Sequence, residues 1–390
     1  MKIVCVISLL CITTTACCSS LGENLRKLQL SDSEIIEASE SQKLQLRRRG
    51  VNFMDISNFP TLFGSKQKEI QAPNYSYPIS SSHQNTAKEI INAINKQSMY
   101  DNLAHLSSFY TRYYKSETGY ESACWLLENL RNVTMPLKDK IDVIQIDHHD
   151  WKQFSLIVRI NGTNTPENIV VFGSHHDSMN LLLPSILAAP GADDNASGTS
   201  TNIEALRLYV NYLQNSGSWP TNTIEFHFYS AEEGGLLGSL DVFTRYSAEQ
   251  RKVVAMLQQD MTGYVQDPKN EHVGVITDYT SPGLAQFTRM IIDNYLSIPY
   301  RNSTCGYACS DHGSATKNGF PAIYVIESEY SQTNKYIHST MDTLDRLSLD
   351  HMAEHVKLVI GFLLELGDWT VDEIKKTQQN ENVVMDAMDI

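Results

Sequence analysis

Two short motifs in the middle of the chain combine histidine and aspartate in the way that metal sites do. The first is Ser-His175-His176-Asp177-Ser, and the second is Gly-Ala-Asp193-Asp194-Asn-Ala-Ser-Gly. Imidazole and carboxylate groups are the ligands that zinc takes in sites where it activates water. Three later segments supply further groups of the same kind: Glu232-Glu233, Asp260 and His338. We therefore expect a zinc site assembled from distant parts of the chain.

The hydrophobic pattern predicts the elements that must position these side chains. A buried strand over 169–172 leads into His175, and an amphipathic helix over 197–213 begins just after Asp194. The other candidates follow predicted strands in the same way: Glu232-Glu233 after 223–229, Asp260 at the end of 253–260, and His338 in the loop after 322–327. Because functional groups collect at the ends of parallel strands, we expect these side chains at one edge of a sheet.

The order of elements predicts the fold class. Helical patterns over 86–109 and 119–132 precede a hairpin of two strands, 141–146 and 154–160, after which strands and helices alternate. The remaining predicted helices cover 236–246, 283–297 and 349–366. Such alternation is typical of an α/β domain. We expect a single globular domain with a central mixed, mostly parallel sheet, a hairpin at its edge and helices on both faces.

A second occurrence of the first motif serves as an internal control. His148-His149-Asp150 has the same letters as the motif at 175–177, but it lies between the two hairpin strands. No Gly-Ala-Asp-Asp partner follows it at close range. We assign it no chemistry, because a histidine or aspartate at a hairpin turn is usually a surface or structural residue.

The N-terminal part of the chain predicts processing. Residues 1–20 have the pattern of a signal peptide, whose apolar run is short for a membrane span; an uncleaved anchor and lipidation of Cys17 are the alternatives. Residues 21–82 are expected to be a removable pro-region and linker that folds with the rest of the chain or inhibits it. The run Arg47-Arg48-Arg49 within it is either a processing site or a solvated charge cluster. The main domain then covers 83–370, and a polar tail covers 371–390.

Composition limits the partners and the compartment. The formal net charge of −14 argues against nucleic acid or an anionic membrane as the main partner. Four Asn-x-Ser/Thr sequons fit a secreted, extracellular protein: Asn74, Asn132, Asn161 and Asn302. Only three of the seven cysteines lie beyond the first 20 residues, too few for a disulfide scaffold. Cys305 and Cys309 could close a small ring or stay separate thiols, and Cys124 is expected in the core.

Six motifs together resemble those of the secreted co-catalytic zinc leucine aminopeptidases, both the bacterial leucyl aminopeptidases and the fungal extracellular enzymes. The resemblance covers roughly residues 86–366, and the motifs occur in that family's order. They are Gly-Ser-His175-x-Asp177-Ser, Pro-Gly-Ala-Asp193-Asp194-Asn-Ala-Ser-Gly, Ala-Glu232-Glu233-x-Gly-Leu-x-Gly-Ser, Gln-x-Asp260-Met-Thr, Cys305-Gly-Tyr307-Ala-Cys309-Ser-Asp-His and Ile-His338-Ser-Thr-x-Asp-Thr.

The resemblance implies a site with two Zn²⁺ ions in each chain. It assigns His175 and Asp260 to one zinc, and Glu233 and His338 to the other. Asp194 matches the carboxylate that bridges both ions. A single bridging carboxylate can hold two cations a few ångströms apart, as two-metal hydrolytic sites require.

Further roles follow from the same resemblance. Asp177 matches the carboxylate that orients the zinc-bound imidazole, Glu232 the general base, and Tyr307 the donor that stabilises the oxyanion. A short disulfide between Cys305 and Cys309 would hold the Tyr307 loop.

The resemblance also implies an apolar pocket for the first residue of a peptide or protein substrate. It places Met261, Ile326 and Tyr330 there, together with Tyr307. Ile326 and Tyr330 stand where the bacterial enzymes carry phenylalanine, which leaves the breadth of the pocket open. Leucine and other large apolar first residues are the expected substrates.

Three other functions fit parts of the pattern. A carboxypeptidase of this superfamily would bring an extra domain, a glutaminyl cyclase would lack one ligand of the pair, and a metal-free binding module would not need Glu232. The chain has all five predicted ligands and Glu232, and we expect no extra domain. We therefore predict a secreted, monomeric aminopeptidase that acts on free N-termini and has no stable association with membranes.

Overall fold

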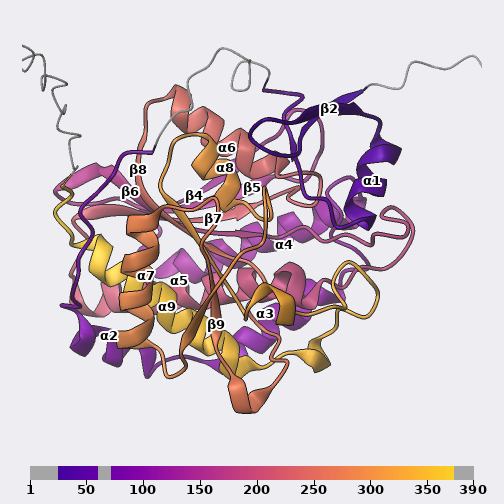
Figure 1. The fold of residues 1–390 in the computed structure, drawn as a ribbon. Coiled ribbons are helices and arrows are strands. Elements are labelled where there is room, and N and C mark those ends of the chain that lie inside the picture. The colour runs from indigo at the N-terminus through magenta and orange to yellow at the C-terminus, as the bar shows by residue number, and fades with distance from the viewer. Residues whose placement is uncertain (1–24, 60–71, 373–390) are drawn as a thin grey trace, which may run out of the picture.

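The computed structural model describes residues 25–59 and 72–372. The predicted signal peptide and nearly all of the polar tail lie outside the described residues. Within these residues, an eight-stranded sheet forms the centre of the molecule, in the order β10-β9-β11-β8-β6-β7-β5-β4 (Figure 1). Its strands are β4 (Ile141–Ile146), β5 (Ser155–Ile160), β6 (Thr165–His175), β7 (Asn222–Tyr229), β8 (Lys252–Gln259), β9 (Val273–Ile276), β10 (Tyr300–Ser303) and β11 (Ala322–Ile326).

The sheet is mixed, as predicted. Strands β6, β7, β8 and β11 run parallel to one another at its centre. The hairpin β4–β5 joins β7 antiparallel at one edge, and β9 pairs antiparallel with β11 near the other. The predicted α/β fold with a hairpin edge is therefore confirmed.

Helices cover both faces of this sheet (Figure 1). They are α2 (Gln84–Ile91), α3 (Lys96–Ser108), α4 (Glu117–Thr134), α5 (Gly198–Ser216), α6 (Leu237–Ala248), α7 (Pro282–Tyr295), α8 (His312–Lys317) and α9 (Leu349–Gly367). The larger apolar core lies between the sheet and α5, α7 and α9, whereas α6 and α8 pack on the opposite face. None of the helices among the described residues is both long and apolar enough to cross a membrane.

The predicted helix over 86–109 is wrong in detail, because two helices occupy it. The first ends at Ile91, and Asn95 caps the second by accepting hydrogen bonds from the backbone N–H groups of Gln97 and Ser98. The backbone N–H of Asn95 is itself held by the buried carboxylate of Glu204, at 2.7 Å. A long-range contact therefore fixes a break that helical periodicity does not reveal.

The predicted pro-region and linker contains two folded parts. Residues 25–59 form a small unit, which we call the N-terminal module, with strands β1 (Arg26–Gln29), β2 (Ile35–Ala38) and β3 (Met54–Asp55) and helix α1 (Glu40–Arg48). This module lies over one end of the central sheet, and α1 stands at the rim of the molecule (Figure 1).

The second part is residues 72–82, which we call the strap. Tyr77 is buried there, its hydroxyl donates to the carbonyl oxygen of Val254 at 2.7 Å, and its ring packs against Trp369. The carboxylate of Glu365 accepts two backbone N–H groups at the end of the strap. The strap is therefore part of the core of the main domain.

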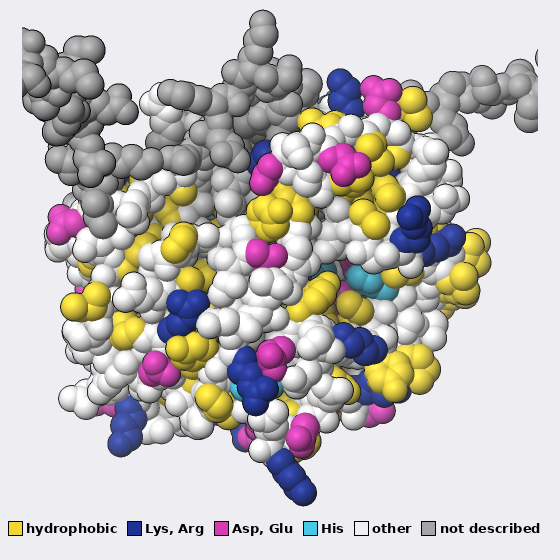
Figure 2. Space-filling model, in the orientation of Figure 1, with side chains coloured by type: hydrophobic (Ala, Val, Ile, Leu, Met, Phe, Trp, Pro, Cys, Tyr) yellow, Lys and Arg dark blue, Asp and Glu magenta, His cyan; other side chains and the backbone are white. Residues whose placement is uncertain are grey.

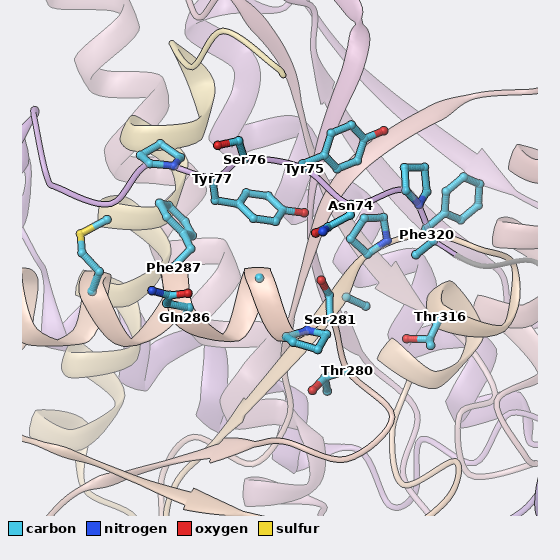
Figure 3. A pocket seen from close by; sticks show the side chains of 18 of the residues that line it. Asn74, Tyr75, Ser76, Tyr77, Thr280, Ser281, Gln286, Phe287, Thr316 and Phe320 are labelled. Atoms are coloured by element: carbon cyan, nitrogen blue, oxygen red, sulfur yellow. The ribbon is translucent and has the colours of Figure 1, made fainter. Parts of the chain in front are cut away.

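A cavity of about 820 Å³ lies between the strap and the beginning of α7. Figure 3 shows Tyr77 and Phe287 on one side of it and Ser281 and Thr316 on the other. None of the residues predicted for the metal site lines this cavity. The cavity is therefore separate from the predicted metal site, and its volume alone does not indicate a catalytic role.

Candidate active site

The first cluster forms where two neighbouring parallel strands end. Strand β6 ends at His175, and Asp260 follows the last residue of β8. The His175 Nε2 atom lies 3.3 Å from Asp260 Oδ1 and 3.2 Å from Asp194 Oδ1. Burial alone would lower the pKa of His175, but the carboxylate of Asp260 and its neighbours outweigh burial and raise that pKa well above its usual value.

The second cluster shares one residue with the first. The His338 Nε2 atom lies 3.0 Å from Asp194 Oδ2 and 3.0 Å from Glu233 Oε2. Asp194 thus presents one carboxylate oxygen to each imidazole. The five predicted ligands are assembled as two groups of three that meet at Asp194, in agreement with the bridging role that the resemblance implies.

Asn195 explains how the second motif reaches the end of β8. Its side-chain amide donates to the carbonyl oxygen of Gln259, and its side-chain oxygen accepts from the backbone N–H of Met261. The backbone also comes close here, because a Cβ atom on Gly198 would lie 2.3 Å from that same carbonyl oxygen. The absence of a side chain at Gly198 therefore permits the approach that sets Asp194 beside Asp260.

The two groups fit divalent zinc. Two ligand atoms that bind one tetrahedral zinc at about 2.1 Å lie about 3.4 Å apart, close to the distances of 3.0 to 3.3 Å observed here. Glu233 is buried, and apart from the imidazole of His338 at 3.0 Å its carboxylate oxygens have no polar partner among the described residues. Buried, unpartnered carboxylate oxygens that face imidazoles are suited to a cation.

Asp177 connects the first cluster to the glutamate pair. Its two oxygens accept the backbone N–H groups of Glu232 and Glu233 at 3.0 and 3.2 Å, and one of them lies 3.3 Å from His175 Nδ1. Asp177 itself is fully buried. It therefore fixes the imidazole and the turn that carries the glutamates at the same time.

Glu232 lies in the turn after β7 and is buried like its neighbours. Burial raises the pKa of Glu232 well above its usual value, and the nearby Arg47 guanidinium opposes that rise. A raised carboxylate pKa suits a general base that works near neutral pH. The role predicted for Glu232 as general base stays a prediction.

The predicted disulfide is present between Cys305 and Cys309. The loop that it closes carries Tyr307, whose burial raises the pKa of its hydroxyl, so the group stays a protonated donor. Ser310 follows directly and donates to Asp260 Oδ2 at 2.6 Å. The disulfide loop is therefore linked to the first cluster. Cys124 is a free, half-buried thiol packed against the core, as expected.

The predicted pocket residues divide into two kinds. Met261 and Ile326 are buried in one apolar cluster that also includes Cys305. Tyr330 is 41% exposed, and its hydroxyl lies in the electrostatic field of His338. On the face drawn in Figure 2, histidine is visible over small areas only, one of them beside a hollow.

Sequence reasoning gave no role to two residues that shape the site. Asp342 accepts the backbone N–H groups of Asp193 and Asp194, each at 3.0 Å, and so positions the residue that the two clusters share, Asp194. Asp342 is part of the His338 motif, and its place there was the sequence feature that could have indicated its role. Arg47 reaches Glu232 from the N-terminal module, and an ambiguous tribasic run was its only signal.

Comparison with known proteins agrees with this geometry. The sequence profile of peptidase family M28 matches residues 155–363. The chain belongs to peptidase family M28. Members of this family are zinc-dependent hydrolases and its relatives are named aminopeptidases, so the protein is a zinc-dependent aminopeptidase, and the two clusters are candidate metal-binding groups.

Individual M28 relatives resemble the chain over most of its length. A probable aminopeptidase of Saccharomyces cerevisiae is 59% identical over 351 residues, which are 89% of this chain and 94% of that protein. Leucine aminopeptidase 1 of Coccidioides posadasii is 44% identical over 346 residues, 87% of this chain and 88% of that protein. The aminopeptidase LapA of Legionella pneumophila has the same fold, with a TM-score of 0.78 and 26% identity over 89% of this chain and 99% of that chain.

Proposed function

We propose that this M28 aminopeptidase is a secreted, monomeric enzyme that uses two zinc ions to release large apolar residues, such as leucine, from peptide N-termini. The observation that carries the two-metal assignment is Asp194, which faces His175 with one oxygen and His338 with the other. His175, Asp260 and Asp194 would hold one ion, and Glu233, His338 and Asp194 the other.

When bound, the zinc ions supply a water molecule whose pKa is low enough to lose a proton near neutral pH. Glu232 is the base for that proton, and it returns the proton to the departing amine as the peptide bond breaks. The Tyr307 hydroxyl donates a hydrogen bond to the oxyanion of the tetrahedral intermediate. The buried carboxylates also favour a cationic amino terminus over a blocked one.

Substrate preference and location have separate support. Met261, which follows Asp260 in the chain, and Ile326 belong to one apolar cluster, and the Coccidioides posadasii relative is named leucine aminopeptidase 1. The signal-peptide pattern and the sequons at Asn74, Asn132, Asn161 and Asn302 support secretion, and all four asparagines are exposed.

The test is Glu232→Ala, with Glu249→Ala at an exposed position as the matched control. We expect Glu232→Ala to keep two zinc ions, measured by metal analysis, and to lose about 10³-fold in kcat for a leucyl anilide. Glu249→Ala should match the parent protein. Full activity of Glu232→Ala, or equal cleavage of blocked and unblocked leucyl peptides, would refute the proposal.

A further inference from the structure

The candidate metal site reaches solvent beside His338. The His338 side chain is 19% exposed, whereas those of Asp194 and Asp260 are 8% and 7% exposed. The side chains of His175 and Glu233 are each 1% exposed. A peptide whose first residue lies at the metals therefore leaves the site past His338.

The loop that joins the first two motifs of the site lies against His338. The backbone N–H of Leu181 in this loop donates to the carbonyl oxygen of His338 at 3.0 Å. Residues 178–192 stand between Asp177 and Asp193, yet they include no charged side chain. The path out of the site therefore runs along an uncharged loop.

Apolar side chains of this loop and of a neighbouring segment face solvent. Leu182, Leu183 and Ile186 are 64%, 44% and 63% exposed. Tyr110 is 58% exposed, and its hydroxyl donates to the carbonyl oxygen of Ile186 at 2.9 Å. We call these four residues the apolar rim. Single exposed apolar residues are ordinary on protein surfaces, but a group of them in one place marks a binding surface.

Hydrogen bonds at the base of the loop hold the apolar rim in place. The Ser178 hydroxyl donates to the carbonyl oxygen of Ala189 at 2.8 Å, and the Asn180 side chain donates to that of Ala188 at 2.9 Å. The backbone N–H of Ala189 donates to the carbonyl oxygen of Tyr110 at 2.8 Å. These bonds use backbone and polar atoms and leave the apolar side chains of the rim outside. A surface fixed before its ligand arrives loses little conformational entropy on binding.

We propose that the apolar rim binds the part of the substrate that follows the scissile bond, and that the enzyme therefore prefers peptides whose second and third residues are large and apolar. This inference rests on the aminopeptidase function proposed above. It concerns the departing part of the peptide, whereas Met261, Ile326 and Tyr330 concern its first residue.

The position of the apolar rim favours the substrate as its occupant. The rim continues from the opening of the site, because Leu181 is bonded to His338 and directly precedes Leu182. A peptide that extends beyond its second residue therefore meets the rim. Each apolar side chain that packs there removes nonpolar surface from water. A serine gains little by the same contact, and a charged residue finds no opposite charge in residues 178–192.

The experiment measures release of the first leucine from Leu-Leu-Leu, from Leu-Ser-Ser and from leucinamide, which has no second residue. The parent secreted enzyme should prefer Leu-Leu-Leu to Leu-Ser-Ser about tenfold in kcat/KM. The variant Leu182→Ser/Leu183→Ser should reduce that preference to about twofold, through a lower kcat/KM for Leu-Leu-Leu relative to leucinamide. Leu182→Met/Leu183→Met keeps the apolar surface and should keep the preference within about twofold of the parent value. The control is Met135→Ser, since Met135 is 52% exposed at the end of α4, and it should match the parent.

The substrate preference of the parent tests the inference even if the serine variant fails to fold. A parent that cleaves Leu-Leu-Leu and Leu-Ser-Ser equally well, or a serine variant with the full parent preference, overturns the role of the rim, while hydrolysis of leucinamide shows that the aminopeptidase function stands. Light scattering covers the other occupant: a dimeric parent that becomes monomeric on serine substitution assigns the rim to a second copy of the chain and also overturns the inference. If the parent hydrolyses none of the three substrates, the proposed function itself fails.

Discussion

The sequence His-His-Asp occurs twice in this chain, at 148–150 and at 175–177, and the two copies have different environments. His148 Nδ1 lies 2.7 Å from Asp241 Oδ2, and His148 Nε2 lies 2.7 Å from the Ser155 hydroxyl. Both of its ring nitrogens therefore have partners within the protein. His175 has three carboxylates around it, those of Asp177, Asp194 and Asp260.

The comparison shows that burial does not separate a metal ligand from a structural histidine. Both first histidines are buried, with 8% and 1% exposure for His148 and His175. What differs is the surplus of negative charge, since His148 faces one carboxylate and His175 faces three. A buried surplus of this size calls for a cation, and zinc supplies it.

The largest difference should appear when the first histidine of each copy is replaced. We expect His175→Ala to lose one zinc and about 10³-fold or more in kcat, because an activating metal loses a ligand. His148→Ala should keep kcat within about twofold. Its unfolding free energy should fall by roughly 2 kcal/mol, because the Asp241 carboxylate loses a buried partner. Zinc analysis, leucyl-anilide kinetics and thermal melting separate the two effects.

Equal loss of zinc in the His175→Ala and His148→Ala variants would contradict this comparison. So would a His175→Ala protein that kept two zinc ions and full turnover.

The third residue of each copy should show a smaller difference. Asp177 accepts two backbone N–H groups of the glutamate turn, whereas Asp150 is partly exposed and accepts from Asn58 of the N-terminal module at 2.7 Å. Asp177→Asn should weaken zinc binding about 10- to 100-fold, measured by competition with a chelator. Asp150→Asn should leave zinc affinity within about twofold. Equal losses of zinc affinity in the two variants would show that Asp177 does not position the zinc ligands.

The ligands were predictable from the sequence because each stands in a motif that also specifies its local backbone. His175, Asp194, Glu233, Asp260 and His338 lie at strand ends or turns that alternation of apolar segments locates well. The central strands β6, β7, β8 and β11 were found for the same reason.

Elements with weak local signals were missed. Strand β10 reads Tyr-Arg-Asn-Ser and is partly exposed at the sheet edge, and β9 has only four residues. The N-terminal module has strands of only four residues, and its Met54 and Ile56 pack in one apolar cluster with Leu236 and Tyr307 of the main domain. Arg47 and Glu232 are 185 residues apart in sequence, so no local pattern could join them. Contacts of that separation are a property of the fold and not of the segment.

The middle residues of the two copies should differ least in function and most clearly in titration. The hydrogen bond to Asp150 raises the pKa of the exposed His149, and burial lowers the pKa of His176 to about 4. The His149–Asp150 ion pair is therefore complete below pH about 6.5 and is lost as the pH rises through the raised value. In an NMR titration the His149 imidazole should have its midpoint above pH 6.5. The His176 imidazole should stay neutral from pH 8 to pH 5. Asp150→Asn should return the His149 midpoint toward its ordinary value. Parallel titration of both rings would mean that the two histidines share an environment, and the contrast between the two copies would then rest on their first and third residues alone.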